Sequence, residues 1–303
     1  NDDASKVRRM RGTIVRIEWS ARENDDGVVW PFPDLTPLAT GRPPTFSHRF
    51  RGLVEGFAVL NPHVTLRLDW FGNKTTWEAT DLGWQKWRPC QPTSAHWYEP
   101  SHLERLIAAY ITNDREAGTD RLVSDFLAEF DGLSGSQKRS RVLNNTDLRR
   151  VKLSELVAGD RLDGARIERL LRSMQEHTRP VKSKRLGVIG EDHLRQRLLE
   201  MGVQPESFRY SKRQSKDGLP WVIESAFGWK GEGSEDIRTI FTGANWSAAI
   251  GSPFRRFGDT GEGLETALAE FRATRNEPVA FVLHLAHPRV EYTDRGKSAL
   301  VIG

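Results

Sequence analysis

Residues 279–300 read VAFVLHLAHPRVEYTDRGKSAL, and this stretch decides how the rest of the chain is interpreted. Residues 279–285 are an apolar run of strand length, which predicts a buried strand. The polar loop that follows places Gly296 directly before Lys297. A lysine held at a fixed point beside a glycine can contact phosphate with its compact ammonium charge. A solvated surface lysine is the plainer alternative, and both interpretations stay open at this level.

The composition is that of a globular protein. A chain of 303 residues with 37% hydrophobic residues can bury one sizeable core or several smaller ones. It has no apolar run of about 18 residues and no basic-then-apolar start, so we expect no membrane span, membrane partner or signal peptide. The single Cys90 excludes an internal disulfide framework and a cysteine-rich metal cluster. We expect a cytoplasmic protein, and the start without Met suggests a piece of a longer chain.

The net charge of +4 is unevenly distributed along the sequence. Residues 131–217 hold 20 Lys and Arg against 12 Asp and Glu, so this middle region carries +8 and the remainder carries −4. A basic region of this kind is typical of a surface that faces a polyanion such as nucleic acid. A solvated surface of mixed charge explains the same count, and the composition does not separate the two hypotheses.

The first hundred residues predict strands, a helix and irregular segments. Apolar and polar residues alternate over residues 15–19, as in a half-buried strand. Several Pro and Gly residues predict an irregular segment at residues 24–47, followed by a helix at 50–60 and a strand at 64–70. The tryptophan-rich residues 77–98 predict a loop packed over a core. A platform for stacking bases is the alternative.

The middle of the chain has a helical pattern. Residues 101–104, Ser-His-Leu-Glu, resemble a capping box. The apolar stripe that follows consists of Leu103, Leu106, Ile107, Tyr110 and Ile111. Asp163 is expected to cap a later helix, and residues 191–201 form another helix that Gly202 ends.

The last third predicts an αβ unit within a sheet. Strands are expected at residues 218–228, 237–241 and 279–285. An amphipathic helix is expected at residues 263–274, with Phe271 on its inward face. Asn245 and Trp246 fall in a turn, where a structural role is favoured over a functional one.

Five landmarks occur in the order in which a known family carries them. Gly12-Thr13-x-Val15 resembles the last motif of the ATPase domain that gyrase, heat-shock chaperones, histidine kinases and MutL share. The others are Asn-Pro-His at 61–63, Leu-Gly-Val-Ile-Gly-Glu at 186–191, Gly-Leu-Pro-Trp at 218–221 and Gly-Lys-Ser-Ala at 296–299. Together they resemble the B subunit of DNA topoisomerase VI, a type IIB enzyme of the GHKL ATPase superfamily. The chain departs from that pattern at Gly187-Val188, where the family has Ser-Pro.

The resemblance implies an α+β fold in three parts. Residues 1–100 would be the C-terminal remnant of the ATPase domain, with the end of its sheet. Residues 101–202 would be a small helical domain of helix-two-turn-helix-like type, and residues 203–303 an α/β transducer domain of ribosomal-S5-like fold. The motifs that bind Mg²⁺ and adenine in the family are missing from the sequence. ATP and Mg²⁺ would therefore be bound by the full-length parent, and neither by this chain alone.

The resemblance also implies site residues. Lys297 would reach the γ-phosphate of ATP from the loop that begins at Gly296, and Thr13 would lie beside the adenine-binding aspartate. The candidates for contact with a DNA backbone are Lys138, Arg139 and Arg141. A solvated helix surface is the alternative for those three. We expect no catalytic residue and no metal site in this chain; His284 and His287, for example, fall on opposite faces of a strand.

The function implied is that of a transducer in the B subunit of an ATP-dependent type IIB DNA topoisomerase, coupling ATP binding to DNA strand passage. The expected partners are DNA, a topoisomerase VI A-like subunit and a second copy of the parent in an ATP-dependent homodimer. The parent would be an isomerase that hydrolyses ATP, whereas this chain alone would not be catalytic. Two other functions stay open: a GHKL-type ATPase regulator in a defence or signalling system, and a plain nucleic-acid-binding module.

Overall fold

The computed structural model describes residues 22–24, 27–29, 46–70, 73–88, 90–215, 219–232, 237–256, 262–296 and 298–301. The chain divides into two compact units, residues 1–51 and residues 52–303. The predicted strand at residues 15–19, Thr13 and Lys297 lie outside the described residues. What is described is a mixed α+β protein, in agreement with the fold class expected from the sequence.

The described part of the first unit contains a short hairpin. Strands β1 (Arg22–Asn24) and β2 (Gly27–Val29) pair antiparallel. The prediction that residues 24–47 are irregular is therefore wrong at β2, whose Gly27 pairs with Asn24 of β1. Helix α1 (Phe46–Leu60) begins in the first unit, ahead of the predicted start at residue 50, and ends in the second.

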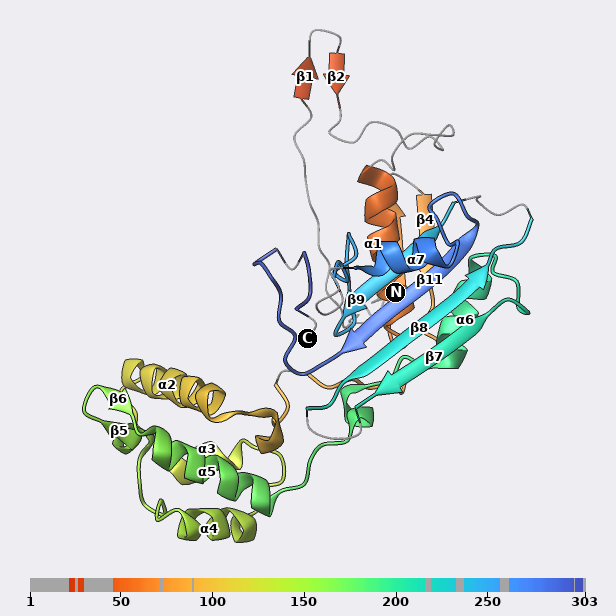
Figure 1. The fold of residues 1–303 in the computed structure, drawn as a ribbon. Coiled ribbons are helices and arrows are strands. Elements are labelled where there is room, and N and C mark those ends of the chain that lie inside the picture. The colour runs from red at the N-terminus through yellow and green to blue at the C-terminus, as the bar shows by residue number, and fades with distance from the viewer. Residues whose placement is uncertain are drawn as a thin grey trace, which may run out of the picture. The chain divides into compact units, whose positions relative to one another are not determined.

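The second unit is built around a five-stranded mixed sheet with the order β10-β9-β11-β8-β7 (Figure 1). Its strands are β7 (Arg209–Gln214), β8 (Val222–Trp229), β9 (Thr239–Ala244), β10 (Ser247–Ala248) and β11 (Val279–Ala286). Neighbouring strands are antiparallel except β9 and β11, which are parallel. Helix α7 (Leu264–Glu270) lies between them in the chain, so the predicted αβ unit and its returning strand are confirmed.

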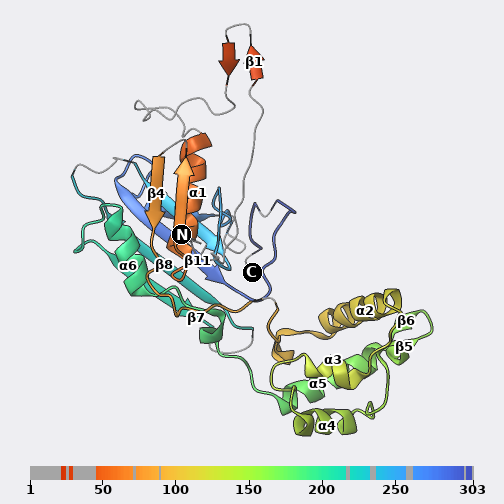
Figure 2. The same cartoon turned by 180° about the vertical axis from the view of Figure 1, so that it is seen from behind.

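The two faces of the sheet carry separate apolar clusters because successive side chains of a strand point to opposite sides. On one face, Val222 and Val282 pack with Leu60 at the end of α1 and with helix α6 (Glu191–Glu200). On the other face, the half-buried side chains of β11 pack with α7. Figures 1 and 2 show the same arrangement, with α7 on one side of the sheet and α6 on the other.

Helix α7 is shorter than the sequence predicts. It ends at Glu270, and Phe271 is 82% exposed, so the prediction that Phe271 faces inward is wrong. Arg272 adopts a left-handed backbone with φ 57°, and the Ala273 N–H donates to the Leu268 carbonyl at 2.8 Å. This turn ends the helix and buries Ala273 in place of Phe271.

A second core lies among helices α2 (Pro100–Glu116), α3 (Val123–Ala128), α4 (Ser136–Asn145) and α5 (Gly164–His177). Two residues of the predicted stripe, Leu103 and Ile107, are completely buried in it. The predicted capping box at residues 101–104 is wrong: α2 begins at Pro100, and Glu99 precedes it without a side-chain cap. Proline suits the first helical turn because its missing N–H would be unpaired there anyway.

The predicted cap of α5 is confirmed. The Asp163 side chain accepts a hydrogen bond from the Arg166 N–H at 3.1 Å. Short 3₁₀ helices at Ala95–Trp97, Leu153–Leu156 and Ser183–Leu186, and a two-stranded hairpin of β5 (Val157–Ala158) and β6 (Arg161–Leu162), complete this part of the chain.

The tryptophan-rich segment packs over a core, as predicted. Trp97 is 4% exposed within the cluster on the α6 side of the sheet, and Trp84 and Trp87 are half-buried against that cluster. Just before this segment, β3 (Leu66–Trp70) and β4 (Asn73–Trp77) form a two-stranded hairpin. The sequence predicted the first of these strands and missed the second, since β4 is mostly polar.

Helix α6 shares its core with the sheet. Leu194 and Leu198 pack against β8, whereas the family resemblance places residues 101–202 together in one helical domain. Gly202, with φ 88°, follows the end of α6 as predicted. Among the described residues, no helix is long and apolar enough to cross a membrane.

Candidate functional site

The segment that would carry the phosphate-contacting lysine forms a hairpin at residues 291–301, here called the tail hairpin. Tyr292 and Leu300 face each other in an antiparallel bridge, and the Thr293 N–H donates to the Ala299 carbonyl at 3.0 Å. The Leu300 N–H also donates to the Pro253 carbonyl at 2.8 Å, and its side chain is buried beside α7. The base of the tail hairpin is therefore fixed to the sheet's α7 side.

Asp294 holds the two sides of the tip together. Its carboxylate accepts a hydrogen bond from the Ser298 N–H at 3.2 Å and a second from the Ser298 hydroxyl. The hydrogen bonds from Ser298 hold the pKa of Asp294 below its usual range. Lys297 lies outside the described residues, but its neighbours Gly296 and Ser298 are both described, and Gly296 is exposed.

Sequence reasoning singled out Gly296 and Lys297 and missed Asp294. The available signal was an acidic residue followed by serine four positions later around a glycine, a composition in which the carboxylate can bond to backbone N–H groups of its own turn. The loop is thus organised by its own side chains as well as by the strands that carry it.

The end of β11 is held by the turn between β9 and β10. Asn245 and Trp246 both adopt left-handed backbone conformations, with φ 49° and 63°. The Asn245 amide donates to the His287 carbonyl and accepts from the His287 N–H, both at 2.9 Å. These two bonds fix the point where the chain leaves the sheet for the tail hairpin, which is the structural role favoured from the sequence.

A buried histidine lies directly behind that turn. The Trp246 N–H donates to His284 Nε2 at 3.1 Å, so the neutral ring carries its proton on Nδ1, 3.9 Å from Glu224 Oε2. Both side chains are fully buried. Burial, with the nearby charge of Lys86, lowers the pKa of His284 to about 3. Because Nε2 is already occupied, His284 cannot accept a proton from a substrate, and its role here is structural.

Lys86, which belongs to the tryptophan-rich segment, lies close to His284 and Trp246. Its ammonium donates to Asn61 Oδ1 at 2.8 Å and lies 5.5 Å from the centre of the Trp246 ring. Partial burial, followed by the charge of Arg88, lowers the pKa of Lys86. Sequence reasoning did not identify Lys86, because one lysine within an irregular segment carries no pattern.

Glu224 connects β8 to the glycine-containing run at residues 186–191. Its carboxylate accepts hydrogen bonds at 2.8 Å from the Ile189 and Gly190 N–H groups and at 2.7 Å from the Tyr210 hydroxyl. Gly190, with φ 95°, immediately precedes α6. The run that resembles the family motif is therefore a turn whose contact with Glu224 fixes the start of α6 to β8.

Gly187 is required at its position for two reasons. Its φ of 110° is a conformation that side chains with a Cβ rarely adopt. A Cβ there would lie 2.9 Å from the Trp246 ring and 3.2 Å from the Gln85 carbonyl. The departure from the family's Ser-Pro at residues 187–188 thus coincides with close contact between this turn and Trp246.

Arg289 connects the tail to the start of α2. Its guanidinium donates to the Trp97 carbonyl at 3.2 Å and to His102 Nε2 at 2.9 Å. In the sequence, Arg289 lies two residues after His287, which bonds to Asn245, and shortly before the tail hairpin. One arginine therefore joins the end of the sheet to the first turn of the helical segment.

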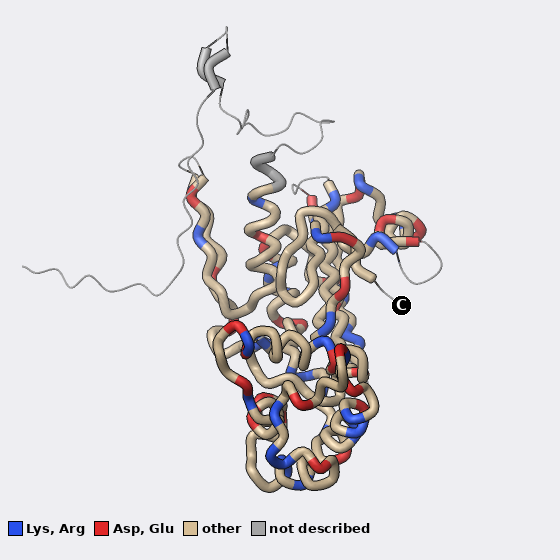
Figure 3. The backbone as a smooth tube through the Cα atoms, turned by 90° about the vertical axis from the view of Figure 1, so that its left-hand side faces the viewer, with Lys and Arg blue, Asp and Glu red and all other residues tan. Residues whose placement is uncertain are grey.

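The three predicted DNA-contact residues all lie on α4. Lys138 and Arg141 are exposed and have no hydrogen-bond or ion-pair partner among the described residues. Arg139 differs, because its guanidinium donates to the carbonyls of Leu133 and Ser134 and so braces the turn before the helix. Figure 3 shows acidic residues interspersed with basic ones in the helical segment, so the positive charge there is not uniform.

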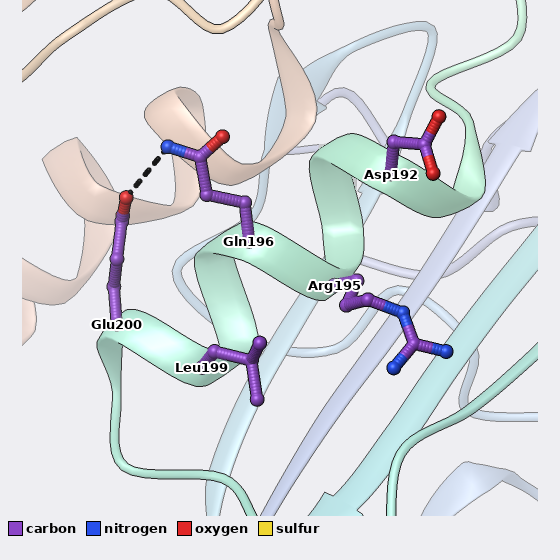
Figure 4. A pocket seen from close by; sticks show the side chains of 5 residues that line it. All are labelled: Asp192, Arg195, Gln196, Leu199 and Glu200. Carbon is purple, nitrogen blue, oxygen red and sulfur yellow. Dashed lines mark hydrogen bonds between the residues drawn. The ribbon is translucent and has the colours of Figure 1, made fainter. Parts of the chain in front are cut away.

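A shallow hollow follows the outer face of α6 (Figure 4). All five lining residues belong to that helix: Asp192, Arg195, Gln196, Leu199 and Glu200. Gln196 donates to Glu200 at 2.9 Å, and the Arg195 guanidinium lies 4.4 Å from the Phe208 ring centre. Its polar groups are largely engaged with their own helix, which is the arrangement of a solvated helix face.

The described residues contain no group of three or more His, Cys, Asp or Glu side chains that could hold a metal ion. No family model matches this sequence, and a search of curated proteins also finds no match.

Proposed function

We propose that this chain is the transducer part of a topoisomerase VI B-like ATPase, in which Lys297 contacts the γ-phosphate of ATP bound by the parent protein. The sequence resemblance is the reason for assigning a phosphate contact to Lys297. The tail hairpin supports this assignment because its described residues are held by hydrogen bonds. In this proposal the sheet with its β9–α7–β11 unit is the ribosomal-S5-like transducer, and the helices α2 to α5 are the helix-two-turn-helix-like domain. The partners are DNA, an A-like subunit and a second copy of the parent.

The observation that carries the proposal is the bracing of the tail hairpin on both sides of residue 297. Asp294 bonds to Ser298, while the Leu300 N–H bonds to the Pro253 carbonyl. The hydrogen bonds between Ser298 and Asp294 restrict the described backbone next to position 297, so less conformational entropy remains to be lost at Ser298 when the neighbouring lysine meets a phosphate. Lysine suits a reversible contact because it binds as a point charge.

The contacts around β11 supply a route from that loop to the rest of the protein. While the phosphate is present, its pairing with Lys297 would favour one position of the tail hairpin, and hydrolysis would release that preference. Arg289 would pass the change to α2, since it bonds to the Trp97 carbonyl and His102. The coupling so produced would gate DNA strand passage by the A-like partner.

The test is ATP turnover by the complete protein with Lys297→Ala. We expect turnover to fall on the order of 100-fold, as for removal of a positioned charge-stabilising group in other active sites. Arg295→Ala is the matched control, because Arg295 is exposed in the same loop and has no side-chain partner among the described residues. Turnover that is unchanged by Lys297→Ala, or a complete protein without ATPase activity, would overturn the proposal.

A further inference from the structure

A second hollow lies between the end of α4 and the middle of α5, away from the tail hairpin. Its lining consists of Asn145 from α4 and Arg169, Arg172, Ser173 and Glu176 from α5. The α5 residues are spaced by three, four and seven positions, so they share one side of that helix. Every lining residue has a polar side chain, unlike the apolar lining typical of a pocket for a small molecule.

Ser173 is the residue that points to a ligand. Its side chain is 5% exposed, and its hydroxyl has no hydrogen-bond partner among the described residues. Leaving a buried hydroxyl unpaired costs about 1–3 kcal/mol, so such groups normally have a partner. A hydroxyl that lines a polar hollow can find its partner in a molecule that enters the hollow.

The charges of the hollow favour a singly charged anion. Arg172 donates to Glu168 at 2.9 Å, whereas Arg169 is exposed and has no hydrogen bond or ion pair with any described residue. Glu176 is the one carboxylate in the lining, and it opposes the binding of a doubly charged group. A phosphodiester has one negative charge and oxygen acceptors for a guanidinium, an amide and a hydroxyl.

The exposed basic residues of α4 extend this site. Lys138 and Arg141 precede Asn145 by seven and four positions, so the three lie along one side of α4. Seven residues of helix span about 10 Å. Measured along the duplex axis, that length corresponds to three phosphates of one strand, at about 3.4 Å of axial rise each. A strip of positive and amide groups therefore runs along α4 into the hollow.

We propose that the hollow between α4 and α5 binds a backbone phosphodiester of duplex DNA through Arg169, Asn145 and Ser173. Lys138 and Arg141 contact neighbouring phosphates of the same strand. This inference builds on the proposed function, in which DNA is a partner, and assigns that partner a binding site. Arg139 is excluded from the contact set, because it is bonded to the turn before α4.

The experiment is a fluorescence-anisotropy titration of the complete protein with a labelled duplex of about 30 base pairs at several salt concentrations. Arg169→Gln is expected to weaken binding about tenfold on every duplex sequence and to lower the salt slope by about 0.9, the value for one phosphate contact. Ser173→Ala is expected to weaken binding about threefold, the loss of one hydrogen bond, without lowering stability, since its hydroxyl has no partner in the fold. Arg115→Gln on α2 is the control, because Arg115 is exposed and unpaired among the described residues and should leave binding unchanged.

Three results would overturn this inference. The first is DNA affinity and a salt slope that Arg169→Gln leaves at the wild-type values. The second is Arg169-dependent binding of inorganic phosphate without binding of the duplex, and the third is a stronger Arg169-dependent affinity for duplex RNA of the same sequence. ATP turnover without DNA separates this inference from the proposed function, since Arg169→Gln should not change it and Lys297→Ala should.

Discussion

Two carboxylates organise loops in this protein by the same chemistry in opposite surroundings. Glu224 is completely buried and accepts hydrogen bonds from the Ile189 and Gly190 N–H groups. Asp294 is exposed and accepts from the N–H and hydroxyl of Ser298. The first fixes the turn before α6 to β8, and the second joins the two sides of the tail hairpin.

The difference in burial decides how much each carboxylate contributes to the free energy of unfolding. In the interior no water can replace a lost acceptor, so removal of Glu224 would leave two N–H groups and the Tyr210 hydroxyl without partners. At the surface, water pairs with whatever Asp294 releases. The buried carboxylate is therefore a determinant of stability, and the exposed one is a determinant of local geometry near a proposed functional residue.

The largest effect is expected from Glu224→Ala. We expect it to lower the free energy of unfolding by about 3–5 kcal/mol, because it leaves buried hydrogen-bond donors without an acceptor in a site that solvent does not reach. Urea unfolding followed by tryptophan fluorescence measures this. Glu168→Ala is the control: its exposed ion pair with Arg172 should contribute less than about 1 kcal/mol. Equal losses in the two variants would erase the distinction drawn between the buried and exposed carboxylates.

The buried region should also make stability depend on pH. Burial lowers the pKa of His284 to about 3 and that of His193 to about 4. Since both fall below the unfolded value near 6.5, their contribution is complete above pH 6.5 and is lost as the pH falls toward 4. Each histidine should account for a loss of roughly 2 kcal/mol between about pH 7 and about pH 5.

Urea unfolding at half-unit steps of pH checks that expectation. His193→Asn should reduce the total loss by roughly 2 kcal/mol, the share of that ring, because His284 and the two other histidines whose pKa burial lowers, His63 and His287, still titrate. A free energy of unfolding that is level over the same pH range would show that neither ring is kept neutral by burial. Asp294 contributes nothing comparable there, since its pKa is already lowered and its titration lies at more acidic pH.

A smaller effect is expected at the turn that Glu224 holds. Gly187→Ala should cost about 1–3 kcal/mol, because it combines an unfavourable φ of 110° with a Cβ 2.9 Å from the Trp246 ring. Gly135→Ala before α4 is the matched control, with φ −74° and no atom within 4 Å of the added Cβ. Thermal unfolding of the two variants measures the difference, and a Gly187→Ala protein as stable as the control would contradict the assigned packing.

The smallest effect on stability, and a clear effect on activity, is expected for Asp294→Asn. The melting temperature should stay within about one degree, because solvent pairs with the groups released at an exposed site. If Lys297 contacts ATP, turnover by the complete protein should fall about tenfold, because the loop loses charge-assisted hydrogen bonds that order it. Asp192→Asn on α6 is the control for an exposed aspartate. A large drop in melting temperature would instead make Asp294 a stability determinant like Glu224.

Much of the architecture was predictable from local pattern. The strand at residues 279–285, the helix after Asp163 and the helix ended by Gly202 were all expected, since each depends on neighbours within one or two turns. The errors have local causes as well. Phe271 fits the helical period, but the left-handed turn at Arg272 ends α7 before it can face inward.

The candidate site was predictable only in part. Gly296 and Lys297 stand out in the sequence because the two residues are adjacent. The hydrogen bond from the Ser298 N–H to Asp294 could not be predicted from those two residues. The hollow between α4 and α5 was not predictable, because Arg169 and Ser173 come from one helix and Asn145 from another. Helical spacing alone predicts that Lys138 and Arg141 are on the same side of α4 as Asn145. It does not predict that this side of α4 lies beside α5.

The sequence by itself determined the mixed α+β class, the buried strand before the tail hairpin and the basic character of the middle region. The strand and the charge follow from the period of apolar residues and from charge counts, which need no knowledge of distant contacts, and the α+β class was implied by the family resemblance. Only the tertiary structure decided that Glu224 holds the turn 35 positions before it and that His284 is kept neutral behind Trp246. The physical reason is that burial, which sets the strength of each polar contact, is a property of packing between distant segments.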